Sequence, residues 1–193
     1  MAKKEELRIV AGEWRGRRIT VPVDGVRPTA DRVREAWLSI VRPALDGARV
    51  VDLCAGTGAL GLEALSRGAA HCDFVERSAE VLKVLNKNLT ALGAEGRSTL
   101  HRSDAIEFVE SQVPPAAEPS ARWDVAFGDP PYREGVAVAL AERWLRAPFA
   151  TIFGVEHETA LTLPTPAAES LTSSDRRVYG ATTLTFYRLP TFL

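Results

Sequence analysis

Short apolar runs alternate with longer amphipathic stretches along most of this chain. A β-branched run over residues 49–53 is followed by a helical pattern over 59–67, and this pairing is repeated further along. Short apolar runs are typical of buried strands, and apolar positions spaced by three and four residues are typical of helices. Strands that alternate with helices form a mostly parallel sheet with right-handed crossovers. The pattern predicts an α/β fold with strands at 49–53, 72–75, 98–102, 123–127 and 149–155 and helices at 59–67, 78–91, 105–111 and 134–146.

The N-terminal part departs from this alternation. Leu7–Val10 and Arg18–Val21 are β-type runs on either side of a turn-rich segment, and they predict a β-hairpin. Between them an exposed Trp14 lies beside two arginines, where it could stack on a base or pack into a small core. A helix is expected to follow and to stop at Pro43, with an apolar stripe made by Val33, Ala36, Trp37, Ile40 and Val41.

The C-terminal part also departs from it. Two β-type runs, at 176–179 and 183–189, flank a glycine and predict an antiparallel pair at the edge of the sheet. The segment 113–122 is rich in proline and alanine and is interpreted as a surface loop. We therefore expect a small hairpin extension over residues 1–28, followed by a Rossmann-like domain over 29–193.

Composition narrows the class of protein. The chain has 193 residues, 46% of them hydrophobic and 25% charged, as in an ordinary globular domain. It contains neither an apolar run of membrane-spanning length nor a signal-peptide pattern, so a cytoplasmic protein is expected. Cys54 and Cys72 lack metal-ligand spacing and are interpreted as reduced thiols. His71, His101 and His157 are scattered, and no metal site is predicted.

Charge is distributed unevenly although the net charge is only −1. Residues 1–49 hold eleven Lys or Arg against seven acids, which leaves the remainder of the chain at −5. A basic end on an acidic body favours contact with a polyanion, although a solvated basic hairpin would show the same composition. The candidate RNA-binding residues are Arg15, Arg17, Arg18, Arg32 and Arg34.

A glycine-rich turn follows the first strand of the alternating part. Gly56, Gly58 and Gly61 have the spacing of a dinucleotide-binding turn, which on its own would favour NAD. Asp52 at the end of the strand argues against NAD, because its carboxylate would repel a pyrophosphate in a partly desolvated cleft. S-Adenosylmethionine carries an ammonium and a sulfonium and suits an acid there. The candidate cofactor residues of this turn are Asp52, Ala55, Gly56, Thr57 and Gly58.

Acids also end the next three strands. Glu76, Asp104 and Asp129 each follow a predicted strand, and ligands of open α/β sheets bind beyond the carboxyl ends of strands. Glu76 lies about twenty residues after the glycine turn, where an acid accepts hydrogen bonds from ribose hydroxyls. Asp104 would accept a hydrogen bond from the adenine amine, although for Asp104 taken alone helix capping is the better explanation. Arg77 and Ala105 complete the candidate cofactor residues.

The turn Asp129-Pro130-Pro131-Tyr132 is the most informative motif of the chain. Two prolines directly after a buried strand stiffen the turn and cannot donate to a ladder. The Asp129 carboxylate and the Pro130 carbonyl can accept hydrogen bonds from the two N–H groups of an amino group on a base. Tyr132 can stack on the ring of that base. Positioning and electrostatics then supply most of the rate. These four residues are the candidate catalytic set.

The sequence resembles the RsmD family of bacterial 16S rRNA (guanine-N2) methyltransferases. The resemblance is carried by Arg8–Gly12, Arg27–Glu35, Asp52–Ala69, Asp129–Tyr132 and Arg177–Gly180. Cys54 and Ala30 depart from the residues common in the family, and neither is a proposed catalytic group. The resemblance implies a class I methyltransferase sheet, S-adenosylmethionine as cofactor, and one guanine of 16S rRNA in an assembled or partly assembled small subunit as substrate. It also implies a cytoplasmic enzyme, which we expect to be monomeric.

Three other functions remain open at the level of sequence. Asp-Pro-Pro-Tyr turns also occur in enzymes that methylate adenine N6 or cytosine N4 in DNA. An NAD-dependent oxidoreductase would keep the glycine turn but is disfavoured by Asp52. A non-catalytic RNA-binding factor would need neither the four acids nor the Asp-Pro-Pro-Tyr turn.

Overall fold

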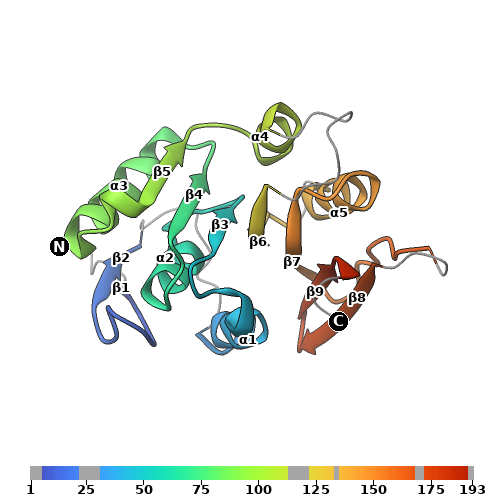
Figure 1. Ribbon diagram of the computed structural model, residues 1–193, viewed down its shortest axis with the longest axis horizontal. Helices are drawn as coiled ribbons and strands as arrows, with labels where there is room; N and C mark the ends of the chain where they lie inside the picture. The colour runs from blue at the N-terminus through green and yellow to red at the C-terminus, as the bar shows by residue number, and fades with distance from the viewer. Residues whose placement is uncertain (1–5, 22–30, 113–121, 133–134, 168–171, 191–193) are drawn as a thin grey trace.

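The computed structural model of the protein describes residues 6–21, 31–112, 122–132, 135–167 and 172–190. A seven-stranded sheet forms its centre, with the strand order β5-β4-β3-β6-β7-β9-β8 (Figure 1). Five strands are parallel and the last two are antiparallel, as predicted. The strands are β3 (Arg49–Asp52), β4 (His71–Val75), β5 (Ser98–His101), β6 (Trp123–Gly128), β7 (Ala150–Glu158), β8 (Ser173–Tyr179) and β9 (Thr182–Arg188).

Helices cover both faces of this sheet. Neighbouring residues of β3 point to opposite faces, so Val50 packs into one core cluster and Val51 into the other. The first cluster contains side chains of α1 (Asp31–Val41), α2 (Ala59–Ser66) and α3 (Ala79–Leu92). The second contains those of α4 (Ala105–Gln112) and α5 (Val136–Arg146). The result is a three-layer α/β sandwich.

The glycine turn allows α2 to lie directly against the sheet. A Cβ atom at Gly61 would come within 2.3 Å of Phe74 and 2.8 Å of the Cys72 sulfur on β4. Gly56 and Gly58 have φ values of +52° and +81°, which a residue with a side chain rarely adopts. Gly56 and Gly58 are thus required by the backbone conformation of the turn, and Gly61 by the close packing of α2 on β4.

The N-terminal hairpin is part of the main core. Strands β1 (Glu6–Arg8) and β2 (Arg18–Thr20) pair antiparallel, as expected. The expectation of an exposed Trp14 is wrong, because the side chain is only 5% exposed and packs in the first core cluster with Ile9 and Ile19. Trp14 therefore anchors the hairpin on the domain and is not available to stack on a base.

Two further sequence expectations can be compared with the structure. Helix α1 ends at Val41, and a short 3-10 turn over Arg42–Ala44 contains Pro43. The proline- and alanine-rich segment lies outside the described residues except for Arg122. In the part of the chain that is described, no helix is both long and apolar enough to cross a membrane.

Candidate active site

The candidate site lies where β3 and β6 meet in the centre of the sheet. β3 continues to β4 on one side, whereas β6 continues to β7 on the other, so the strand order reverses between them. Ligands of open α/β sheets bind in the crevice at this switch point, beyond the carboxyl ends of the strands. Backbone bonds from Leu53 to Phe127 (2.9 Å) and from Ala55 to Val75 (2.9 Å) extend the pairing past the strand ends. The glycine turn is thereby fixed next to the end of β6.

Glu76 is held against the glycine turn. Its Oε2 accepts a bond from the Gly56 N–H at 3.1 Å, and its Oε1 accepts one from the Ser78 N–H at 2.8 Å. Ser78 in turn caps α3 through a bond from the Val81 N–H. Each carboxylate oxygen keeps a second lone pair that could accept a bond from a ligand hydroxyl.

Asp52 is a buried carboxylate that is only half satisfied. The side chain is 1% exposed, and its Oδ2 accepts a bond from the Gly61 N–H at 3.1 Å. Its Oδ1 is buried and makes no hydrogen bond with the described residues. The pKa of Asp52 is raised to about 7, mainly by burial and in part by the negative charges of Asp129 and Glu76, while the backbone N–H groups of Gly61 and Cys54 oppose the rise. A bound cation would offset the cost of ionising this group.

The four acids predicted from the strand ends act together on Cys54. Burial raises the pKa of the Cys54 thiol above its ordinary value, and the negative charges of all four acids raise it further. These acids are Asp52, Asp129, Glu76 and Asp104. The structure therefore brings the four acids close to one cysteine, whose thiol is held in its neutral form.

Asp104 also has a structural role. Its Oδ1 accepts bonds from the Ile106 N–H at 2.8 Å and the Glu107 N–H at 3.3 Å, which caps the first turn of α4. The capping role considered for this residue is thus present. Ala105 is buried beside it, and Arg77, which follows Glu76 in sequence, is exposed.

The Asp-Pro-Pro-Tyr turn is fastened to the neighbouring strands through its tyrosine. The Tyr132 hydroxyl donates to Oε1 of Glu156 on β7 at 2.9 Å and also lies 2.9 Å from the Thr182 hydroxyl on β9. The pKa of Tyr132 is raised to about 12, mainly by burial and in part by the carboxylates of Glu156 and Asp129, while the Thr182 bond opposes the rise. Asp129 is half-buried, Pro130 buried and Pro131 exposed.

Sequence reasoning missed Glu156 and Thr182 as partners of this turn. Glu156 is only 5% exposed and interrupts the apolar run of β7. A carboxylate inside such a run is the feature that could have revealed it, because buried acids are almost always paired.

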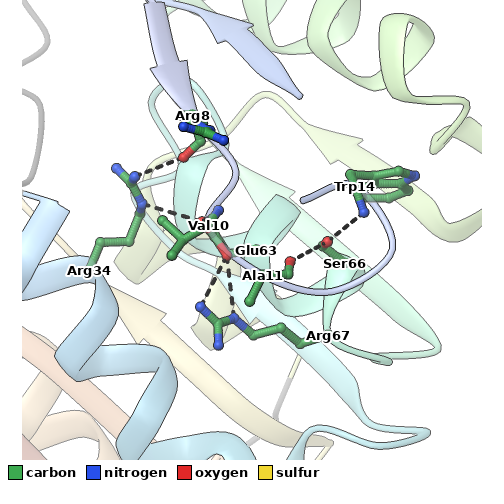
Figure 2. A network of polar contacts seen from close by, with 8 residues as sticks. All are labelled: Arg8, Val10, Ala11, Trp14, Arg34, Glu63, Ser66 and Arg67. Carbon is green, nitrogen blue, oxygen red and sulfur yellow. Dashed lines mark hydrogen bonds and ion pairs between the residues drawn. The ribbon is translucent and has the colours of Figure 1, made fainter. Parts of the chain in front are cut away.

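The prediction that Arg34 binds RNA is wrong. Its side chain is 1% exposed, its Nη2 donates to the Arg8 carbonyl at 3.0 Å, and its Nε lies 3.7 Å from Glu63 (Figure 2). The buried face of α1 is rotated relative to the predicted stripe, so that Leu38 is buried while Ile40 is half-buried. This rotation carries Arg34 inward. The remaining candidate RNA-binding residues, Arg15, Arg17, Arg18 and Arg32, are exposed.

Helix α2 holds the hairpin through two polar side chains that sequence reasoning also missed (Figure 2). Glu63 is 1% exposed and accepts a bond from the Val10 N–H at 2.6 Å, besides its contacts with Arg34 and Arg67. Ser66 donates to the Ala11 carbonyl at 2.7 Å and accepts from the Trp14 N–H at 3.0 Å. The basic hairpin is thereby attached to the helix that begins at the glycine turn.

The histidines make structural contacts, and His71 and His101 both lie near Oδ1 of Asp73, at 3.9 and 2.8 Å. His101 lies 2.8 Å from Asp73 on β4, and His157 is buried with its Nε2 2.9 Å from the Thr185 hydroxyl. Within the described ranges, no cluster of three or more His, Cys, Asp or Glu is arranged to hold a metal ion.

The strand order, the glycine turn after β3 and the Asp-Pro-Pro-Tyr turn after β6 define a class I methyltransferase. The family model described as "Conserved hypothetical protein 95" matches residues 7–188, and the chain belongs to this family. The expected resemblance to the RsmD family is confirmed.

Two curated relatives and one solved structure illustrate the similarity. The chain is 41% identical over 173 residues to "Ribosomal RNA small subunit methyltransferase D" of Escherichia coli strain K12, which covers 86% of this chain and 82% of the relative. It is 31% identical over 186 residues to "Putative rRNA methyltransferase YlbH" of Bacillus subtilis strain 168, covering 94% and 98%. The structure of "Putative methyltransferase yhhF from Escherichia coli" has a TM-score of 0.78 and 34% identity, covering 96% of this chain and 99% of that one.

Proposed function

We propose that this chain transfers the methyl group of S-adenosylmethionine to the exocyclic N2 amine of a guanine in 16S rRNA of the small ribosomal subunit. The observation that carries the proposal is the position of Asp129–Tyr132 directly beside the glycine turn, on adjacent strands. The relatives named as small-subunit rRNA methyltransferases support the choice of RNA. The particular nucleotide, guanine 966 by resemblance to the family, is part of the proposal. We place the enzyme in the cytoplasm, acting as a monomer.

The cofactor would lie along the carboxyl ends of β3, β4 and β5. Glu76 is positioned to accept bonds from the ribose hydroxyls, and Asp104 with Ala105 to meet the adenine. The half-satisfied carboxylate of Asp52 suits the positive charge of S-adenosylmethionine better than a pyrophosphate. The backbone from Ala55 to Gly58 would approach the ligand closely, since two glycines there have positive φ. Arg77 completes the set at the exposed rim.

The residues after β6 would prepare the guanine amine for attack. Bound S-adenosylmethionine supplies an electrophilic methyl group with a neutral thioether as leaving group. The Asp129 carboxylate and the Pro130 carbonyl would each accept a hydrogen bond from one N–H group of the amine, which favours the pyramidal geometry of the attacking nitrogen. Transfer of the methyl group to the nitrogen would break its bond to sulfur, and the Asp129 carboxylate would accept the proton that the methylated amine then loses. Asp129 needs little basic strength, because its main effect is orientation.

Tyr132 would fix the plane of the base. Its hydroxyl is tied to Glu156 and Thr182, so the ring cannot rotate freely about the turn. A ring held in this way is a defined surface on which a flipped base can stack. Holding the base reduces the entropy that must be lost on reaching the transition state.

The basic hairpin would contact the RNA backbone outside the crevice. Arg15, Arg17, Arg18 and Arg32 are exposed and can neutralise phosphates. Arg17 and Arg18 also contact the Ala91 carbonyl and Glu6, which limits how far their side chains extend. Arg34 has no place in this surface, because it is buried.

The substitution Asp129→Ala tests the catalytic assignment. We expect methyl transfer to small subunits to fall by on the order of a hundredfold or more, with binding of S-adenosylhomocysteine retained. Tritiated methyl incorporation and calorimetric titration measure the two quantities. Asp124→Ala is the matched control, because Asp124 is an exposed carboxylate at the opposite end of β6. Full activity of Asp129→Ala would disprove the assignment.

The nucleic-acid substrate is tested by comparing small subunits, free 16S rRNA and duplex DNA in the same incorporation assay. We expect transfer to guanine in the ribosomal RNA and none to DNA. Incorporation into adenine or cytosine of the duplex would instead support the DNA methyltransferase alternative. Mapping the methylated nucleotide in cells with and without the protein would identify the position.

A further inference from the structure

Asn88 is a polar residue at a core position of α3. It is 3% exposed and lies on the same helical face as Leu85, Leu89 and Leu92, which are all buried. Asparagine is a poor helix former compared with leucine, and a buried amide is costly unless it is hydrogen-bonded. A leucine would serve packing better at this position, so the amide needs another explanation.

The amide of Asn88 makes three hydrogen bonds to two distant backbone segments. Its Oδ1 accepts from the Thr20 N–H at 2.9 Å, and its Nδ2 donates to the Thr20 carbonyl at 3.0 Å and to the Thr57 carbonyl at 3.1 Å. The partners fix the orientation of the amide, since an N–H can only donate and carbonyls can only accept. Both N–H groups of the Asn88 side chain therefore donate hydrogen bonds.

These bonds join the hairpin to the glycine turn. Thr20 is the last residue of β2, and Thr57 stands between Gly56 and Gly58 in the turn. The peptide group between Thr57 and Gly58 is held at both ends, because its carbonyl accepts from Asn88 and its N–H donates to the Ala55 carbonyl at 2.7 Å. A displacement of β2 would therefore act on this peptide group through one side chain.

We propose that Asn88 is a positioning residue that links the N-terminal hairpin to the glycine turn. Through it, the position of the hairpin on the domain determines the conformation of the glycine turn and hence the affinity for the cofactor. The inference rests on the proposed function, in which the hairpin binds RNA and the turn binds S-adenosylmethionine. RNA that steadies the hairpin then strengthens cofactor binding, and bound cofactor strengthens RNA binding by the same factor.

Two Asn88 variants and one control test the local coupling. Asn88→Ala removes all three bonds, and Asn88→Asp keeps the size of the side chain but removes both donors. The control Arg97→Ala loosens the hairpin elsewhere, because Arg97 pairs with Glu13 at 2.7 Å and lies over the Trp14 ring at 4.9 Å without touching the turn. Hydrogen exchange of full-length protein without ligand is the first readout.

We expect faster exchange in both the 18–21 and the 55–61 segments of the Asn88 variants, with β3 and β6 still protected. Arg97→Ala should raise exchange in the hairpin alone. Unchanged exchange over 55–61 in both Asn88 variants would overturn the inference, whatever the protein binds. Because this readout needs no ligand, it separates the inference from the proposed function.

Titration with S-adenosylhomocysteine is the second readout. We expect about tenfold weaker binding in both Asn88 variants, the effect of losing one good hydrogen bond at the turn, and a change below about twofold in Arg97→Ala. A 16S rRNA fragment should strengthen binding to the unaltered protein but not to Asn88→Ala. Equal strengthening in both would overturn the coupling, whereas an unaltered protein that binds no S-adenosylhomocysteine would contradict the proposed function instead.

Discussion

Asp52 shows how burial changes the chemistry of one residue. The carboxyl titrates near pH 3.8 in an unfolded chain, whereas burial raises its pKa to about 7 in the fold. Between these values the folded state holds a proton that the unfolded state has lost. This group therefore contributes less to stability as the pH rises through that range, and its effect levels off above about pH 7.

The same shift predicts a pH-dependent affinity for the cofactor. A cationic ligand binds the ionised carboxylate best, so the affinity for S-adenosylmethionine should rise from pH 6 to pH 8, by up to about tenfold per unit below the pKa. Calorimetric titration at several pH values measures this. Asp52→Asn is the control, because it removes the titrating carboxyl of the protein and leaves the titration of the ligand's amino group unchanged. Equal pH slopes in the two proteins would contradict the prediction.

Arg34 and Arg32 allow stability to be separated from RNA binding on one helix. Arg34→Ala leaves Glu63 buried with one cation fewer and should lower the free energy of unfolding by about 3 kcal/mol. Arg32→Ala removes an exposed side chain and should change stability by less than about 0.5 kcal/mol while weakening RNA binding. Urea unfolding and filter binding distinguish the two effects. Reversed outcomes would restore Arg34 to the RNA-binding surface.

The residue types were sufficient to predict that the four acids lie at the ends of strands. They were not sufficient to predict which polar side chains, such as that of Arg34, are buried. The four strand-end acids follow from strand periodicity, because parallel strands end at the same edge of a sheet. Whether Arg34 points outward depends on how α1 is rotated against the sheet, and a rotation of one residue reverses the answer. Glu156 was missed for the related reason that its partner Tyr132 is 24 residues away in sequence.

At the scale of elements, the hairpin depends on one close approach to α2. A Cβ atom at Gly12, where φ is +85°, would lie 1.7 Å from the Ser66 carbonyl oxygen, so Gly12→Ala must displace the backbone. Gly16→Ala is a matched control, because Gly16 has φ of +86° but its nearest neighbour is the Arg8 side chain at 3.6 Å. We expect a loss of about 3 kcal/mol or more for Gly12→Ala and about 1 kcal/mol for Gly16→Ala. Thermal unfolding measures the stability of the two variants. Equal losses of stability would show that the positive φ, and not the contact with Ser66, determines the effect.

The elements themselves were predictable, whereas their contacts across the fold were not. Every predicted strand and helix within the described residues is present, with ends shifted by a few residues. Local periodicity determines these elements. Several contacts that hold the hairpin join residues far apart in sequence, 52 positions for Trp14 with Ser66 and 68 positions for Thr20 with Asn88. Such pairs leave no periodic pattern in the sequence.

At the scale of the whole molecule, the uneven charge predicts a strong salt dependence. Four exposed arginines on and beside the hairpin would each release counterions from a single-stranded segment, which gives a slope of about −3 in log K against log salt. Arg15→Ala should make this slope shallower by about 0.7. Arg146→Ala, an exposed arginine on α5, removes the same charge from another side and should leave the slope unchanged. Equal slopes for Arg15→Ala and the unaltered protein would exclude Arg15 from the RNA contact.

The order of the strands also affects how the molecule is made. β7 is buried along most of its nine residues, and one of its two neighbours, β9, is formed by the last part of the described chain. While the protein is being translated, β7 therefore has an open edge until residues 182–188 have emerged and turned back to pair with it. Unpaired apolar edges attract other chains, so shortened products of this protein should be lost to aggregation and not persist as inactive monomers. β9 thus protects the nascent chain as well as completing the sheet.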